Sequence, residues 1–294
     1  MEGSKNRTGK SVNDRIDCID GVRDPNQISK LFATKFMAIT NNNESSSVSN
    51  PLPTDRNNHG LAPITIDEIK AIISDMSVSN GSDGIHTYHL RYANSDVLYL
   101  LSVFYNACLI HSYIPRTMLE GIISPRIKNK FGNKNDSSNY REVMISSNLF
   151  KCLEYIILPY IIENFELSDV QYGYRGKTST IMAIGTLKEA LRNYIQKKNV
   201  VYGCFMDMSR AFERVNHNLL ISKIRASNIP VFIANIVQSI LSSSSARVNF
   251  NGQFSNNWQL SRGVRQGGIL SAYLYSIYVN EILDKIRKNR MVYI

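Results

Sequence analysis

The chain has 294 residues, with 34 Lys or Arg against 24 Asp or Glu, so its formal net charge is +10 at pH 7. A hydrophobic fraction of 43% is enough for a buried core and excludes a wholly disordered chain. Positive charge spread along the chain favours a polyanionic partner such as nucleic acid, although charge alone fits a solvated surface equally well.

The four cysteines are widely spaced, which indicates neither a disulfide framework nor a zinc site. No apolar stretch reaches the length of a membrane span, and the polar first residues lack the apolar core of a secretion signal. We therefore expect an intracellular protein of the nucleus or cytoplasm, not secreted and without a membrane partner. Nothing in the sequence indicates a homo-oligomer.

Residues 1–60 are predicted to form an N-terminal segment and a flexible linker. The stretch Ile28–Ile39 repeats apolar residues at helical spacing and is expected to be a helix that docks on another surface. From Thr40 to Gly60 the sequence is rich in Asn, Ser and Pro and poor in large apolar residues, which is typical of a linker.

Residues 61–199 are predicted to be mixed in structure. Thr65 and Glu68 form a capping box before a helix. Short β-rich pieces then flank a basic loop, and Ser147 or Asn148 is predicted to cap a helix that runs to about Glu163. A later helix, from about Ile181 to Gln196, carries an apolar stripe made of Ile184, Leu187, Leu191 and Tyr194.

Residues 200–294 combine strands with a long helix. The nearly continuous apolar run Val200–Met208 predicts a buried strand, with Asp207 at its end. Asn251-Gly252 between two alternating segments predicts a hairpin. A final helix is predicted to turn Leu270, Leu274, Ile277, Ile282 and Ile286 inward. Because strands and helices mix without a regular βαβ repeat, the fold class is predicted to be α+β.

Five stretches occur in a characteristic order: "GSDGI", "NYREVMISS", "QYGYRGKTST", "FMDMSRAFERVNH" and "RGVRQGGILSAYLYSIYVNEIL". Together they resemble the reverse transcriptases of LINE-type, non-LTR retrotransposons, over about the last two thirds of the chain. The resemblance implies a right-hand polymerase fold, with fingers at 61–199, an incomplete palm at 200–294 and no thumb. It also implies an RNA-directed DNA polymerase that acts on an RNA template, a DNA primer and deoxynucleoside triphosphates (dNTPs).

Asp207 is the candidate catalytic residue and magnesium ligand. Nucleotidyl transfer uses two Mg²⁺ ions that clamp the attacking and leaving oxygens, and Mg²⁺ prefers carboxylate ligands. By position alone, an ordinary strand-end or N-cap aspartate is the simpler interpretation; the resemblance favours the metal ligand.

The resemblance assigns nucleotide binding to two segments. Phe212 would pack under the sugar of the incoming nucleotide, although an aromatic residue at this spacing is more often core. In "GVRQGG", Gln266 offers a donor and an acceptor, Gly267 permits close approach of the backbone to a ligand, and Arg265 is expected to face phosphate. The family usually has Asp where this chain has Glu213.

Basic residues of the fingers are the other candidates. Lys128 and Arg141 would bind the triphosphate, Arg141 as a fork and Lys128 as a point charge, with a solvated basic loop as the alternative. The family's Pro-Ile after the arginine is here Glu142-Val143. Arg175 and Lys177 in "QYGYRGKTST" would contact nucleic-acid phosphates, beside tyrosines able to stack on bases.

The resemblance also implies a Tyr-x-Asp-Asp hairpin, which the sequence does not reach. "YVNE" at Tyr278–Glu281 lies in the predicted final helix and is not expected to replace it. We therefore expect a truncated enzyme, with weak or absent Mg²⁺ binding and no activity as this chain. The alternatives are a non-catalytic RNA- or DNA-binding protein with this fold, or a group II intron-type maturase.

Overall fold

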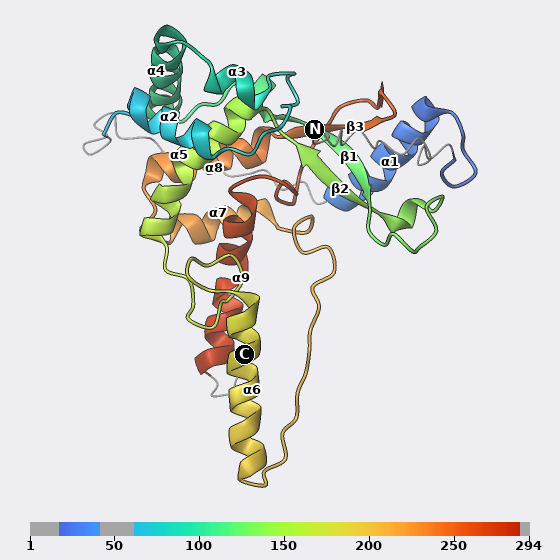
Figure 1. The fold of residues 1–294 in the computed structure, drawn as a ribbon, viewed down its shortest axis with the longest axis vertical. Helices are drawn as coiled ribbons and strands as arrows, with labels where there is room; N and C mark the ends of the chain where they lie inside the picture. The colour runs from blue at the N-terminus through green and yellow to red at the C-terminus, as the bar shows by residue number, and fades with distance from the viewer. Residues whose placement is uncertain (1–17, 42–61, 289–294) are drawn as a thin grey trace, which may run out of the picture.

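The computed structural model describes residues 18–41 and 62–288, with the side chains of the last range up to residue 285. Figure 1 shows a small sheet between α1 on one side and most of the other helices on the other, with α6 (Thr180–Gln196) and the end of the C-terminal helix projecting from this body. The prediction of a mixed helix and sheet fold is therefore confirmed. No helix within the described ranges is both long and apolar enough to cross a membrane.

The sheet joins strands from distant parts of the chain. Its order is β2-β1-β3-β4, with β5 also paired to β3. β1 and β2 are antiparallel, β1 and β3 are parallel, and β3 pairs antiparallel with β4 and β5. The strands are β1 (Glu120–Ile127), β2 (Tyr140–Ile145), β3 (Ser245–Phe250), β4 (Gln253–Phe254) and β5 (Trp258–Gln259).

The predicted hairpin is confirmed between β3 and β4. Asn251 and Gly252 have φ values of +49° and +84°, so both central residues of the turn lie in the left-handed region. A two-residue turn of this kind matches the twist of the flanking strands, and Asn-Gly adopts it with little strain. Local sequence alone therefore determines this element.

The amphipathic helix near the N-terminus docks on this sheet. α1 (Pro25–Thr40) begins at Asp24, whose side chain accepts hydrogen bonds from the next two free amides. The Phe32 ring is fully buried and lies 5.0 Å from the ring of Tyr140 and 5.8 Å from that of Phe250. The predicted helix is confirmed, and the surface on which it docks is the sheet. Residues 42–61, which hold nearly all of the predicted linker, lie outside the described residues.

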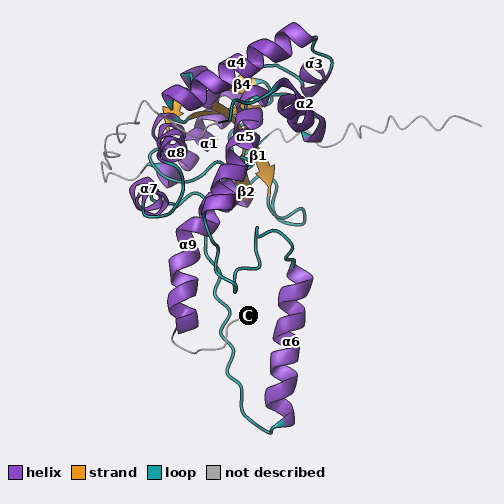
Figure 2. Cartoon of the chain, turned by 90° about the vertical axis from the view of Figure 1, so that its left-hand side faces the viewer, coloured by secondary structure: helices purple, strands orange, loops and turns teal. Residues whose placement is uncertain are grey.

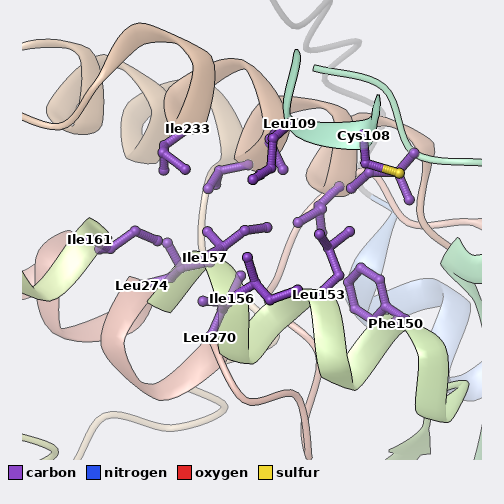
Figure 3. Packing of buried hydrophobic residues seen from close by; sticks show 14 of the residues in the cluster. Cys108, Leu109, Phe150, Leu153, Ile156, Ile157, Ile161, Ile233, Leu270 and Leu274 are labelled. Carbon is purple, nitrogen blue, oxygen red and sulfur yellow. The ribbon is translucent and has the colours of Figure 1, made fainter. Parts of the chain in front are cut away.

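The remaining helices form the larger core. Figure 3 shows Leu153 and Ile157 of α5 packed between Leu109 of α4 and Leu270 at the start of the C-terminal helix. The capping box of Thr65 and Glu68 is confirmed. The other short and long helices are α2 (Ile66–Asp75), α3 (Thr87–Arg91), α4 (Ser95–His111), η1 (Arg116–Leu119), η2 (Ser137–Asn139), α5 (Asn148–Asn164, capped by Ser147), α7 (His217–Arg225), α8 (Val231–Ser243) and α9 (Ser271–Lys288).

Two predicted apolar stripes are only partly right. In α9, Leu274 and Ile277 are buried but Ile282 is 51% exposed, because the helix extends past the core; the Ile286 side chain lies outside the described residues. In α6 no residue is buried, and Ile184 is 48% exposed. Helical periodicity thus locates these helices without fixing how much of each face is covered.

The predicted buried strand at Val200–Met208 is wrong. This segment has no strand structure, and its apolar side chains are exposed, with Tyr202 at 93% and Phe205 at 89%. Figures 1 and 2 show it as an extended loop that returns from the far end of α6 to the body. A buried strand needs neighbours for its N–H and C=O groups. The described strands pair among themselves, and none lies beside this segment.

Candidate functional site

Two segments that are distant in sequence are joined by backbone hydrogen bonds at the centre of the site. Val264 N–H donates to Phe212 O and Gly263 N–H donates to Val215 O, both at 2.8 Å. The buried His217 adds a bond of 2.8 Å between its Nε2 and Gly263 O. These contacts bring two predicted nucleotide-binding residues, Phe212 and Gln266, into one region.

Phe212 belongs to an aromatic cluster. Its ring lies 5.0 Å from the ring of Tyr275 in α9 and 6.1 Å from that of Tyr174, in an edge-to-face arrangement. Tyr174 is 60% exposed, so one side of the cluster faces solvent. The structure therefore places the predicted stacking loop beside the predicted sugar-binding residue.

Gln266 and Gly267 run along strand β2. Met144 N–H donates to Gln266 O at 2.8 Å, and Gln266 Nε2 donates to Glu213 Oε1 at 2.5 Å. Gly267 has a φ of +106°, and a Cβ there would lie 2.9 Å from Met144 O. The glycine is thus required for close approach to the protein's own backbone, which differs from the ligand approach expected from sequence.

Arg265 is buried, which corrects the expectation that it faces phosphate. Its guanidinium donates to the hydroxyls of Ser244 and Ser146 and to the carbonyl of Leu119, and it lies 4.5 Å above the Phe150 ring. Six per cent of the residue is exposed. The sequence "GVRQGG" alone does not predict that Arg265 is buried, because its hydrogen-bond partners come from three distant segments.

Glu154 is the carboxylate associated with this buried arginine. It accepts hydrogen bonds from the N–H groups of Ile269 and Leu270, at 3.2 and 3.4 Å, just before α9. Burial raises the pKa of Glu154 to about 7, although the charge of Arg265 acts in the opposite direction. Burial likewise lowers the pKa of Arg265 to about 10. The two groups stabilise the turn that presents Gln266.

Glu142 and Glu213, two of the departures from the family pattern, line the same cavity of about 20 Å³ as Gln266. Glu142 is 7% exposed, because strand alternation places it between Tyr140 and Met144 on the apolar face of β2. Burial and, after it, the charge of Glu213 raise the pKa of Glu142 to about 8. The sequence identifies both acids as departures but does not place them together.

Arg141 lies in a groove of about 650 Å³ that we call the basic groove. Its lining contains Arg126, which is opposite Arg141 in the β1–β2 register, and Lys130 and Lys134 from the following loop. Arg126 and Arg141 are both exposed. The groove also includes Ser124, Pro125, Ile127, Tyr140, Asn249, Phe250 and Asn251.

Lys128, the other predicted triphosphate ligand, does not line the basic groove. Its side chain is exposed and approaches Ser138 O at 3.5 Å. Its positive charge partly offsets the rise in the pKa of Glu142 and adds to the lowering of the pKa of Lys35. The structure therefore does not bring Lys128 and Arg141 into one pocket.

The loop with Arg175 and Lys177 is held by internal contacts. Arg175 donates to the carbonyls of Ser168 and Asp169 and forms an ion pair of 3.5 Å with the Asp169 carboxylate. Lys177 is exposed and has a φ of +63°. Lys177 is accessible to a phosphate, whereas the guanidinium of Arg175 already stabilises its own loop.

Asp207 is exposed within the extended loop rather than fixed at a strand end. Its carboxylate has the right chemistry for Mg²⁺. Among residues 18–41 and 62–288, however, no three His, Cys, Asp or Glu side chains gather closely enough to hold a metal ion. The described donors therefore do not fit a complete two-metal site, and no catalytic step through a metal follows from them.

The "YVNE" stretch lies within α9, as predicted. Asn280 Oδ1 accepts a hydrogen bond of 2.8 Å from Ser168 N–H. This contact gives Asn280 a structural role in holding the loop before "QYGYRGKTST".

Sequence reasoning missed the clustering of Arg126, Lys130 and Lys134 around Arg141. The available signal was the run of basic residues in "SPRIKNK" and "GNKND", combined with the antiparallel pairing of the two strands. The position of Glu142 could also have been predicted, because strand alternation in "YREVMI" puts it on the same face as Tyr140 and Met144.

Comparison with known proteins supports the same interpretation. The chain is 24% identical over 228 residues to the RNA-directed DNA polymerase from mobile element jockey of Drosophila melanogaster, which covers 76% of this chain and 25% of that protein. It is 26% identical over 226 residues to the jockey polymerase of Drosophila funebris, covering 75% and 24%. The Pol polyprotein of the type-1 element R2 from Popillia japonica is 25% identical over 236 residues, covering 78% and 32%.

The chain thus spans about a quarter to a third of the length of these non-LTR retrotransposon proteins. The sequence profile described as "Reverse transcriptase (RNA-dependent DNA polymerase)" matches residues 132–294, which is more than half of the chain. The match includes Arg141, Asp207, Phe212 and Gln266. The chain therefore belongs to the reverse transcriptase family.

Proposed function

We propose that this chain forms the template- and nucleotide-binding part of an RNA-directed DNA polymerase of a non-LTR retrotransposon. In this proposal, residues 61–199 correspond to the fingers and residues 200–294 to part of the palm. Its partners would be an RNA template, a DNA primer and dNTPs, inside the cell, in the nucleus or cytoplasm. The names of these relatives and the family match support this assignment.

The observation that carries the proposal is the basic groove. Four basic side chains converge on one concavity between the β1–β2 hairpin and the end of β3. Nucleic-acid phosphates are bound by such clusters through charge and hydrogen bonding. Arg141 can contact two phosphate oxygens at once, because its guanidinium is a planar fork. Gln266 and Phe212 supply polar and aromatic contacts for a nucleotide.

Asp207 would contribute one carboxylate to a magnesium site. When bound, Mg²⁺ would supply charge neutralisation at the phosphate under attack. Asp207 is exposed, so it is accessible to such an ion, but the described residues offer no group of three potential metal ligands there.

Binding can be tested with a fluorescently labelled RNA–DNA hybrid by anisotropy over a series of salt concentrations. The combined variant Arg126→Gln, Lys130→Gln, Arg141→Gln is expected to bind at least about 10-fold more weakly, with a salt slope smaller by roughly 1 for each phosphate-binding side chain replaced. Lys188→Gln, on the exposed surface of α6, is the matched control and should bind like wild type. Equal affinity of the groove variant and wild type would refute the groove as the binding site.

Catalysis can be tested by primer extension with RNA template, DNA primer, dNTPs and Mg²⁺. We expect the 294-residue chain to give no template-dependent product, because Asp207 is the only predicted catalytic carboxylate among the described residues. Product formation would contradict this expectation. Hybrid binding without extension would favour a non-catalytic binding role for the isolated chain.

A further inference from the structure

Two buried carboxylate oxygens beside Gln266 have no hydrogen-bond partner. Both Glu142 Oε2 and Glu213 Oε2 are inaccessible to solvent and unpaired. They belong to side chains that line one cavity, together with Gln266. A buried polar atom without a hydrogen-bond partner is destabilising, because the loss of its hydration is not compensated. A pair of them at one place indicates that something bridges the two acids.

Charged groups from several elements line this cavity or act on it from nearby. Negative charge comes from the two glutamates themselves. None of the surrounding cations donates a hydrogen bond to either Oε2 atom. These cations are Lys128 after β1, Arg210 in the loop before Glu213, Arg262 and Arg265 before Gln266, and Lys35 on α1, which interacts with Lys128 and Arg210.

The size of this cavity and the charges around it favour a shared proton over a bound metal ion. The volume of about 20 Å³ has room for one water-sized particle, whereas Mg²⁺ usually retains several of its waters. Two ionised carboxylates in a buried site also repel each other, which favours protonation of one. Once protonated, Glu142 gains an O–H donor, and Glu213 Oε2 can accept its hydrogen bond.

We propose that Glu142 and Glu213 hold one proton between them and that this protonated pair positions the Gln266 side chain. Glu213 then accepts two hydrogen bonds, one from Glu142 at Oε2 and one from Gln266 Nε2 at Oε1. Glu142 and Glu213 are thus positioning residues. That Gln266 serves a nucleotide rests on the proposed function, but the shared proton does not.

The pair makes the Gln266 contact depend on pH. Burial raises the pKa of Glu142 to about 8, so the proton is retained at neutral pH and lost above that value. Loss of the proton leaves two buried negative charges, which drives the carboxylates apart. The Glu213–Gln266 hydrogen bond weakens as a result.

The test follows the side-chain amide of Gln266 by NMR on the full chain labelled with ¹⁵N-glutamine, between pH 6 and pH 9.5. The resonance is assigned by its loss in Gln266→Ala. In wild type it is expected to shift in a single transition near pH 8. In Glu142→Gln the new amide donates permanently to Glu213, so the transition should disappear while the spectrum stays that of a folded protein.

Glu189→Gln, on the exposed surface of α6, is the control and should retain the transition. Glu213→Gln is the second variant; it removes the neighbouring charge, so the transition should move below pH 8, to where burial alone raises the pKa of Glu142. A Gln266 resonance that stays constant in wild type over this range, or a transition that persists unchanged in Glu142→Gln, would overturn the proposal.

Measuring dNTP binding at different pH values distinguishes a failure of this inference from a failure of the proposed function. If both hold, wild type binds a dNTP more weakly above pH 8, and Glu142→Gln binds it equally over the range. If the Gln266 transition occurs but no dNTP binds at any pH, the proton-sharing pair stands and the nucleotide role fails.

Discussion

Arg265 illustrates how a residue type suited to phosphate binding acquires a structural role. Its guanidinium joins the loop before α9 to η1 and to the residues that directly follow β2 and α8. Glu154 lies nearby and accepts the amides of Ile269 and Leu270. A buried charge that loses its compensating partner is strongly destabilising, because desolvation is no longer offset.

We expect Glu154→Ala to lower the free energy of unfolding by roughly 3–5 kcal/mol, since Arg265 loses its counter-charge and two amides lose their acceptor. Glu154→Gln keeps one acceptor oxygen and should cost less. Urea denaturation monitored by circular dichroism measures both. Equal stability of Glu154→Ala and wild type would show that Arg265 is stabilised by its neutral partners alone.

The raised pKa values also predict how stability depends on pH. Glu142 and Glu154 have pKa values of about 8 and about 7 in the folded protein, above their ordinary value of 4.5. At these two carboxyls the folded state therefore binds more protons than the unfolded state over this window, and their contribution to stability falls as pH rises from about 5 to 8. The share of Glu142 is at most about 5 kcal/mol. Urea unfolding at successive pH values should show this decline, reduced in Glu142→Gln.

At the scale of elements, α1 covers one face of the sheet. Its apolar face covers residues of β1, β2 and β3 that would otherwise be exposed, and Phe32 lies at the centre of this contact. The helix therefore contributes to the core that supports the β1–β2 hairpin and the basic groove.

Phe32→Ala is expected to destabilise the protein by about 3–5 kcal/mol, because it removes a fully buried ring and leaves a cavity. Phe131→Ala provides a control of the same chemistry, since Phe131 is 100% exposed, and should change stability by less than about 0.5 kcal/mol. Thermal unfolding of both variants gives the comparison. Similar melting temperatures would mean that α1 does not stabilise the sheet.

At the scale of the whole molecule, α6 and the loop that follows it stand apart from two packed cores. The larger core lies among the helices and the smaller one between α1 and the sheet. The loop has exposed aromatic residues and no strand partner among the described residues. Exposed backbone without secondary structure is the preferred substrate of proteases.

Brief chymotrypsin treatment should therefore cut first, among the described residues, at Tyr202 or Phe205, and leave the buried Tyr105 intact. Mass spectrometry of the first fragments identifies the site. Initial cleavage within α4 or α5 instead would show that the helical core opens more readily than this loop. Protection on addition of the RNA–DNA hybrid would place the loop at the nucleic-acid interface.

The elements that could be predicted are those controlled by near neighbours in sequence. The Thr65–Glu68 capping box, the Ser147 cap and the Asn251-Gly252 turn depend on hydrogen bonds or backbone angles within a few residues. The order of the five family stretches likewise carried the family assignment. The exposed loop structure of Val200–Met208 could not be predicted from its apolar composition, because burial of a strand depends on which other strands lie beside it.

The sequence by itself determined the family, the mixed fold and the candidates Asp207, Phe212, Gln266 and Arg141, because residue identity and order are sufficient for these. Tertiary structure alone decided that Arg265 is buried, that Lys128 does not line the groove that contains Arg141, and that Glu142 and Glu213 line one cavity with Gln266. The physical reason is that burial and charge pairing depend on contacts between residues far apart in sequence. The hydrogen bond from Arg265 to Ser146, for example, joins residues 119 positions apart and forms only in the folded chain.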